Sequence, residues 1–297
     1  MPHLRQSKPV DESLSIRFIL PVMAENLFTI LIGLVFSQII STISASALAA
    51  IGMANAVMQV VFALFSMVIT GAAVLVSRQI GAGENQEAAD TIEQAVLFSL
   101  LSTAAIAVIC IASSRWTLGL LMSTAEEQLF SEAVRYYRVL MLSLPAYVLY
   151  SVLSGIYRSL GNSKMPLAAA MLMNLLQLLF AWVFIKGFRL EELGAGLAYL
   201  LCRLVGAGFL LVMLLRDHHF FVLRVRNMVR LRASTFLRIL RLGIPMSLES
   251  LFVQAGYMLA NSMSISLGTF ESGVYQIMNT LNGFATLPQG KIGRAHV

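Results

Sequence analysis

The stretch AIGMANAVMQVVFALFSMVITGAAVLVS occupies residues Ala50–Ser77 and contains no charged side chain. At about 1.5 Å per residue, a helix of this length crosses the roughly 30 Å hydrocarbon core of a bilayer. Only helices and closed β-barrels satisfy every backbone polar group in lipid, and the short alternating segments of barrel strands are missing here. The stretch therefore predicts a membrane-spanning helix.

The composition of the whole chain agrees with this prediction. Of its 297 residues, 58% are hydrophobic and 12% are charged, and the mean hydropathy is +0.79. Soluble proteins average about 45–50% apolar and about 25% charged residues, so a cytosolic enzyme, a disordered chain and a disulfide-rich secreted domain are excluded. The predicted fold class is an all-α membrane protein, a polytopic helical bundle. Its other predicted spans are Ile16–Thr42, Gln94–Ser113, Val134–Tyr157, Met165–Ile185, Gly194–Leu215, Phe236–Leu267 and one from Ser272.

The distribution of lysine and arginine predicts the orientation of these spans, because cytoplasmic loops are enriched in both. With the N-terminus in the cytoplasm, thirteen of these residues fall on the cytoplasmic side. The basic stretch 219–235 carries several of them, and we expect it to be a cytoplasmic linker on anionic lipid rather than a nucleic-acid site. The five expected outside are Arg115, Arg135, Arg138, Lys186 and Arg189.

An internal repeat links the first span to the seventh. Leu20–Phe28 reads LPVMAENLF and Ile244–Phe252 reads IPMSLESLF, so both contain Pro-x-x-x-Glu-x-Leu-Phe, with an offset of 224 from Pro21 to Pro245. Two complete copies would be longer than this chain, and about four more helices would complete the second copy. We therefore expect the sequence to be a fragment.

The repeat predicts the domain organisation. Residues 1–218 would form a complete six-helix lobe, 219–235 the linker, and 236–290 the first one or two helices of a second lobe. The last seven residues, KIGRAHV at 291–297, match a translated sequencing adapter and are expected to be an artefact.

Four motifs, spread in order along the chain, resemble those of a known family. They are ALAAIG at Ala47–Gly52, GAAVLVSRQIGAG at Gly71–Gly83 followed by Gln94-Ala95, RSLGNSKMP at Arg158–Pro166 with Asn174, and LGAGLA at Leu193–Ala198 followed by Arg203. Together they resemble the multidrug and toxic-compound extrusion (MATE) family. The resemblance implies a twelve-helix secondary antiporter of two six-helix lobes. It would export organic, often cationic, compounds by alternating access, driven by Na⁺ or H⁺.

Three ionisable residues lie inside predicted spans, where charge is costly and therefore marks a functional candidate. Carboxylates suit ion coupling, because they bind hard cations and, when desolvated, can hold a proton near neutral pH. We expect Glu25 and Glu249, each one turn after a proline, to be coupling residues; alternatively, each forms an inter-helix hydrogen bond or pairs with Arg203. Neutral oxygens near Glu25 would come from Asn26, Asn174 and Gln177.

Other residues are assigned from their chemistry. Arg203 is expected to be structural, bonded to helix-end carbonyls or to an acid of a neighbouring helix, and Pro21 and Pro245 are expected to kink their helices. Aromatic rings can stack on flat cations, and flexible methionines can adapt to varied ligands. The candidates for lining a substrate cavity are Phe36, Tyr147, Tyr150 and Met53.

The chain departs from the family pattern at three acidic positions. The family's first-helix Asp falls on Phe36, its fifth-helix acid on Leu178 and one seventh-helix Glu on Val253, so of the known cation sites only Asn174 is carried over. That Glu25 replaces them is a hypothesis.

Two other functions compete with export. A lipid or lipid-linked oligosaccharide flippase of the same superfamily would carry several basic residues in its first helices, whereas Arg203 stands alone inside the spans. A membrane enzyme is not expected, because the four histidines lie outside the spans and no metal-binding cluster is apparent. We expect no cofactor apart from Na⁺ or H⁺ as coupling ion. The expected partners are membrane lipid and small organic substrates, without nucleic acid, and the full-length protein is expected to be a monomer.

Overall fold

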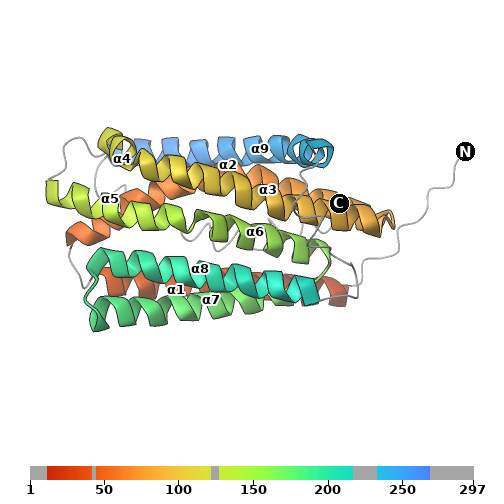
Figure 1. Cartoon of the computed structure of the whole chain (residues 1–297), viewed down its shortest axis with the longest axis horizontal. Helices are drawn as coiled ribbons and strands as arrows, with labels where there is room; N and C mark the ends of the chain where they lie inside the picture. The colour runs from red at the N-terminus through yellow and green to blue at the C-terminus, as the bar shows by residue number, and fades with distance from the viewer. Residues whose placement is uncertain (1–11, 42–44, 122–126, 217–232, 268–297) are drawn as a thin grey trace, which may run out of the picture.

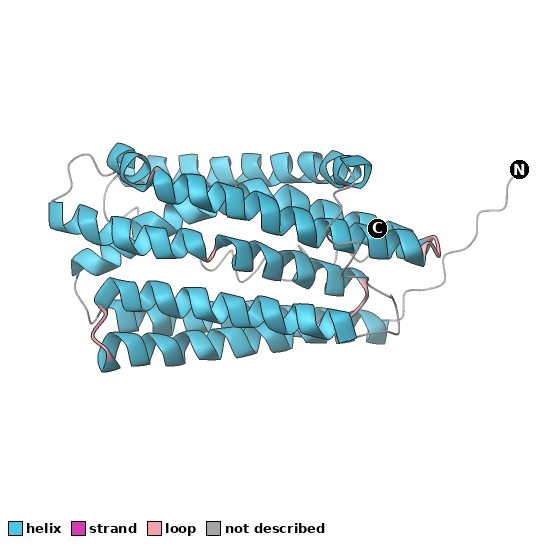
Figure 2. Cartoon of the chain, viewed as in Figure 1, coloured by secondary structure: helices cyan, strands magenta, loops and turns pink. Residues whose placement is uncertain are grey.

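The computed structural model describes residues 12–41, 45–121, 127–216 and 233–267, which form helices joined by short turns, without strands in these ranges (Figures 1 and 2). The predicted all-α class is therefore confirmed. The expected span from Ser272 lies outside the described residues. The elements are α1 (Glu12–Ser41), α2 (Ala45–Gly81), α3 (Asn85–Ala112), α4 (Ser114–Leu121), α5 (Glu127–Leu142), α6 (Leu144–Ser159), α7 (Lys164–Trp182), the π-helical turn η1 (Val183–Gly187), α8 (Glu191–Arg216) and α9 (Ala233–Leu267).

The other seven predicted spans coincide with helices, and one of them is broken. Five described helices are long and apolar enough to cross a membrane, and α5 with α6 makes a sixth span that bends by 43°. The predicted span over Val134–Tyr157 is therefore present, as two helices joined at a bend rather than as one continuous helix. Pro145 at the start of α6 has no N–H to continue the helical ladder, and the Ser143 hydroxyl donates to the Leu140 carbonyl, 2.6 Å away.

The helix-ending turns follow the glycines in the sequence. Gly83 and Gly161 have φ of +80° and +76°, a backbone region that glycine enters without the steric cost of a Cβ. At each turn the amide after the glycine reaches back into the preceding helix, from Glu84 to the Gln79 carbonyl at 2.8 Å and from Asn162 to the Tyr157 carbonyl at 2.9 Å. These bonds form the Schellman pattern that satisfies the last helical carbonyls.

The helices form two groups with the bent span between them (Figure 1). On one side α7 packs against α1 and α8; on the other, α2 packs along α9 and beside α3. The bent span joins the two groups, since α6 contacts α2, α3 and α8. This arrangement gives α6 faces toward both groups. The expected domain boundaries near 218, 235 and 290 fall outside the described ranges and stay predictions.

Helices α2 and α9 approach each other backbone to backbone at Gly71 and Gly243. A Cβ added to Gly71 would collide with the carbonyl oxygen of Ile239, and one added to Gly243 would collide with that of Met67. One helix turn along each helix, the Ser66 and Ser247 hydroxyls lie 3.1 Å apart in a hydrogen bond. Small residues at such a crossing let two helix backbones approach closely in a membrane protein. The crossing fixes the first half of α9 against the core of the bundle.

We expect Gly243→Ala to destabilise the protein, because the new methyl group must push α9 away from the α2 backbone. Overpacking of this kind costs about 1–3 kcal/mol, which would lower the melting temperature measured by fluorescence-detected size-exclusion chromatography. Gly208→Ala is the matched control, since a Cβ at Gly208 meets nothing within 4 Å. Equal melting temperatures for the two variants would contradict the close crossing.

Candidate functional site

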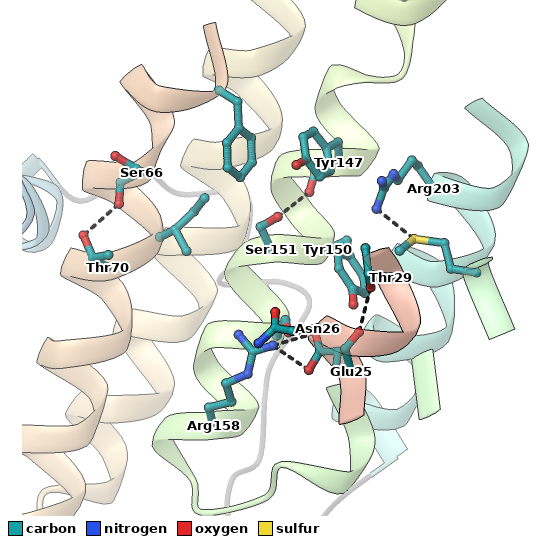
Figure 3. A pocket seen from close by; sticks show the side chains of 14 residues that line it. Glu25, Asn26, Thr29, Ser66, Thr70, Tyr147, Tyr150, Ser151, Arg158 and Arg203 are labelled. Carbon is teal, nitrogen blue, oxygen red and sulfur yellow. Dashed lines mark hydrogen bonds and ion pairs between the residues drawn. The ribbon is translucent and has the colours of Figure 1, made fainter. Parts of the chain in front are cut away.

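A cavity of about 350 Å³ lies among five helices of the described part of the chain (Figure 3). Its polar and apolar lining suits an amphiphilic organic ligand. The lining residues are Glu25, Asn26 and Thr29 of α1; Phe62, Ser66, Ile69 and Thr70 of α2; Tyr147, Tyr150, Ser151, Ser154 and Arg158 of α6; Met173 of α7; and Arg203 of α8. The α6 residues recur at helical spacing, so one face of α6, beginning just after the bend, forms the centre of the cavity wall.

An ion pair between α1 and α6 closes one end of the cavity (Figure 3). Nη2 of Arg158 lies 2.7 Å from Oε1 and 2.8 Å from Oε2 of Glu25. The Glu25 side chain is 11% exposed, whereas that of Arg158 is 33% exposed. Pairing compensates the cost of burying the carboxylate. The expected alternative partner, Arg203, is therefore wrong: the cation is Arg158, whose position near the C-terminal end of α6 also favours a positive charge.

Hydroxyl and amide groups hold α1 beside this ion pair. The Thr29 hydroxyl donates to the Glu25 carbonyl oxygen at 2.8 Å and accepts from the Asn174 side-chain amide of α7 at 3.1 Å. The Asn26 amide donates to the Val22 carbonyl oxygen of its own helix. Asn174 thus reaches α1 through Thr29, and Asn26 lines the cavity next to Glu25.

Arg203 occupies a different part of the cavity, among aromatic rings. Its Cζ atom lies 4.5 Å from the ring centroid of Tyr147 and 4.6 Å from that of Tyr199. Its Nη1 donates to Sδ of Met173 at 3.2 Å. The Tyr147 ring in turn stacks on Phe62, with centroids 4.4 Å apart. The expectation that Arg203 bonds to helix-end carbonyls or a neighbouring acid is not met among the described contacts; cation–π interactions take that place.

The structure gathers some of the predicted site residues and separates others. Glu25, Asn26, Tyr147, Tyr150 and Arg203 share the cavity. By contrast, Phe36 is buried in the hydrophobic core. Gln177 is buried and accepts a hydrogen bond from Sγ of Cys202, and Glu249 is exposed on α9. Pro21 and Pro245 lie inside α1 and α9 without interrupting either helix. The side chain of Met53 lies outside the described residues.

Sequence reasoning missed Arg158, Thr29 and the α2 face of the cavity. Arg158 begins the RSLGNSKMP motif and counts among the thirteen basic residues expected on the cytoplasmic side, and its 133-residue separation from Glu25 gives no local signal of the pair. A long basic side chain within one turn of the end of an apolar helix can extend along that helix. This position was the one sequence feature that could have indicated that Arg158 reaches into the bundle.

Comparisons with known proteins agree with the fold and identify the family. The MatE family model matches residues 21–183, more than half of the chain. The chain belongs to the MatE family. Among curated relatives, this MatE chain is 27% identical over 277 residues to the probable multidrug resistance protein NorM of Thermotoga maritima, covering 92% of the chain. It is 26% identical over 304 residues to the probable multidrug resistance protein YoeA of Bacillus subtilis, covering 98% of the chain.

Solved structures share the same helical arrangement. An outward-facing multidrug resistance MATE transporter aligns with a TM-score of 0.82 at 22% identity. A MOP superfamily transporter from Pyrococcus furiosus, described as having a binding pocket of reverse polarity, aligns with a TM-score of 0.84 at 22% identity. Both alignments cover 94% of this MatE chain and 62% of the solved chain. The chain spans 59% and 64% of the lengths of the two curated relatives.

We expect the Glu25–Arg158 pair to show strong energetic coupling in a double-mutant cycle of Glu25→Gln, Arg158→Gln and the double variant. Each single change leaves one charge without its partner, and the double change removes both, so the coupling energy in the free energy of unfolding should exceed about 1 kcal/mol.

The matched control is the pair of Arg238 and Glu87, whose side chains are 60% and 56% exposed at 3.4 Å. Solvent screening limits such a pair to about 0.2–1 kcal/mol. Equal coupling energies in the two cycles would contradict a buried, structurally important Glu25–Arg158 pair.

Proposed function

We propose that this protein is a secondary active antiporter that exports organic, often cationic, compounds in exchange for Na⁺ or H⁺. Alternating access between two six-helix lobes would carry the substrate across the cell membrane. The observation that carries the proposal is a cavity inside an apolar helical bundle with a paired carboxylate at one end. The multidrug resistance names of the curated relatives support it.

Exchange would depend on competition for the Glu25 carboxylate. In the described state Arg158 neutralises that carboxylate. A proton on Glu25 would remove the negative charge and release Arg158, and a Na⁺ ion would compete with the guanidinium for the same two oxygens. Arg158 is the more exposed partner, so it can move toward solvent when Glu25 is occupied. Binding of the coupling ion thereby changes the charge and shape of the substrate cavity.

The cavity wall suggests how an organic substrate is held. The stacked Phe62 and Tyr147 rings offer aromatic surface to a flat ligand, and the hydroxyls of Ser66, Thr70 and Ser151 offer hydrogen bonds. Aromatic surface beside hydroxyl groups, whose hydrogens can rotate toward different partners, favours recognition of varied compounds. The flippase alternative gains no support from this cavity, because one of its two arginines, Arg158, is already paired with Glu25.

We also propose a plasma-membrane location with a cytoplasmic N-terminus. The α2–α3 and α6–α7 turns lie at the same end of the bundle as the start of α1 (Figure 1). Arg78, Arg158, Lys164 and Arg216 belong to helix termini at that end. Basic residues concentrate on the cytoplasmic side of membrane proteins.

We expect Glu25→Gln, introduced into the complete open reading frame, to abolish ion-coupled efflux. Glutamine keeps the size of the side chain but cannot titrate or supply a negative charge. Ethidium efflux from proteoliposomes, measured under separate Na⁺ and H⁺ gradients, should fall at least about tenfold under the gradient that drives the wild type.

The repeat-related Glu249→Gln is the matched comparison, since Glu249 is exposed and is not among the described lining residues of the cavity. We expect a smaller effect. If Glu25→Gln keeps wild-type efflux and ion dependence, Glu25 is not the coupling residue. If the wild type moves no organic cation under either gradient, export itself is contradicted.

A further inference from the structure

The charged residues of the cavity do not cancel. Glu25, Arg158 and Arg203 are its ionisable lining residues apart from the tyrosines. Glu25 and Arg158 neutralise one another at 2.7 Å, and Arg203 lies away from them near Tyr147 (Figure 3). An arginine is protonated at any physiological pH, so the cavity carries one positive charge beyond the ion pair.

The Arg203 guanidinium has contacts that hold it in place but few acceptors for its N–H groups. The Tyr147 and Tyr199 rings attract the cation through their π-electrons. Its Nη1 donates to the sulfur of Met173, which is a weak acceptor, and the guanidinium also hydrogen-bonds to the Tyr199 hydroxyl. Its Nε atom is buried and lacks a hydrogen-bond partner within the described residues. In the part of the chain described here, none of the ion pairs involves Arg203.

A carboxylate is the chemical group that this arrangement fits. Guanidinium is planar and presents its N–H donors as a fork that matches the two oxygens of a carboxylate. A partly buried guanidinium without an anion is costly in an apolar bundle, so a ligand carboxylate would supply the missing negative charge. Met173 is a flexible side chain that can yield its place to a ligand oxygen.

We propose that Arg203 forms a subsite for the carboxylate of an aromatic, zwitterionic or anionic substrate. The inference rests on the proposed export function and refines its substrate class. The ligand carboxylate binds the guanidinium while its ring system lies beside the stacked Phe62 and Tyr147 rings. A positive group elsewhere on the same molecule is tolerated but is not what the subsite selects.

The test compares two dyes that differ only at the carboxylate. Rhodamine B and rhodamine B ethyl ester share one delocalised cationic ring system, and only the first carries a negative charge. Binding of each dye to protein expressed from the complete open reading frame is measured by fluorescence anisotropy in lipid nanodiscs. A charge-assisted bond to a carboxylate predicts that the wild type binds the acid about tenfold more tightly than the ester.

The variants separate a subsite from a structural role. Arg203→Gln should bring the acid-to-ester affinity ratio to about one, and Arg203→Lys should retain part of the preference, because lysine keeps the charge without the fork. Arg138→Gln is the matched control and should keep the wild-type ratio, since Arg138 bonds to Ser114 outside the cavity lining. Because the readout is a ratio, a general loss of folded protein does not change it.

The outcomes are distinct. A wild-type ratio near one, or a preference that persists in Arg203→Gln, overturns the subsite. If Arg203→Gln does not yield folded protein, the wild-type and Arg203→Lys ratios decide, and equal binding of acid and ester by the wild type overturns the proposal. Ethidium efflux by the same purified protein in proteoliposomes tests export separately. An acid preference without efflux supports the subsite and contradicts the export function. Efflux without an acid preference supports the export function and overturns the subsite.

Discussion

A charge placed inside an apolar helical bundle must be compensated by a neighbouring group, and this constraint organises the centre of the molecule. The Glu25–Arg158 pair satisfies it between α1 and α6. The pair thereby joins α1 to the bent span near one end of the cavity. Arg203 meets the same constraint differently, through two tyrosine rings and a methionine sulfur. The charge of Arg158 is neutralised by the Glu25 carboxylate, whereas the charge of Arg203 has no described anionic partner. The two ends of the cavity therefore differ in charge.

The bend between α5 and α6 makes this arrangement possible. Breaking the span at Ser143, with Pro145 starting the next helix, turns α6 so that Tyr147, Tyr150 and Arg158 share one face toward the cavity. A straight helix over the same residues would direct that face elsewhere relative to α1 and α8. The prolines that the repeat emphasised, Pro21 and Pro245, lie within uninterrupted helices. The break therefore occurs where a proline and a serine hydroxyl act together on the helical hydrogen bonds.

Local properties made part of the fold predictable. The length of the apolar stretches indicates the helical class and the positions of the spans. Glycines such as Gly83 and Gly161, which take a positive φ, mark where helices end. The site was predictable in part. An acid inside a span marked Glu25, and helical aromatics marked Tyr147 and Tyr150. Arg158 was missed because its partner is distant in sequence. Phe36, a cavity candidate, and the coupling candidates Gln177 and Glu249 are not among the described lining residues of the cavity, because the rotation of a helix about its axis is set by its neighbours.

The sequence by itself determined that this chain is a bundle of membrane helices, since only helices and closed barrels satisfy the backbone in lipid and the alternating segments of barrel strands are missing. Its short motifs carried the resemblance to the MATE family. Only the tertiary structure decided which charges meet. It paired Glu25 with Arg158, placed Arg203 between aromatic rings, and set α9 against α2 through two glycines. Such contacts depend on how helices cross and rotate, which follows from packing of the whole bundle rather than from any one segment.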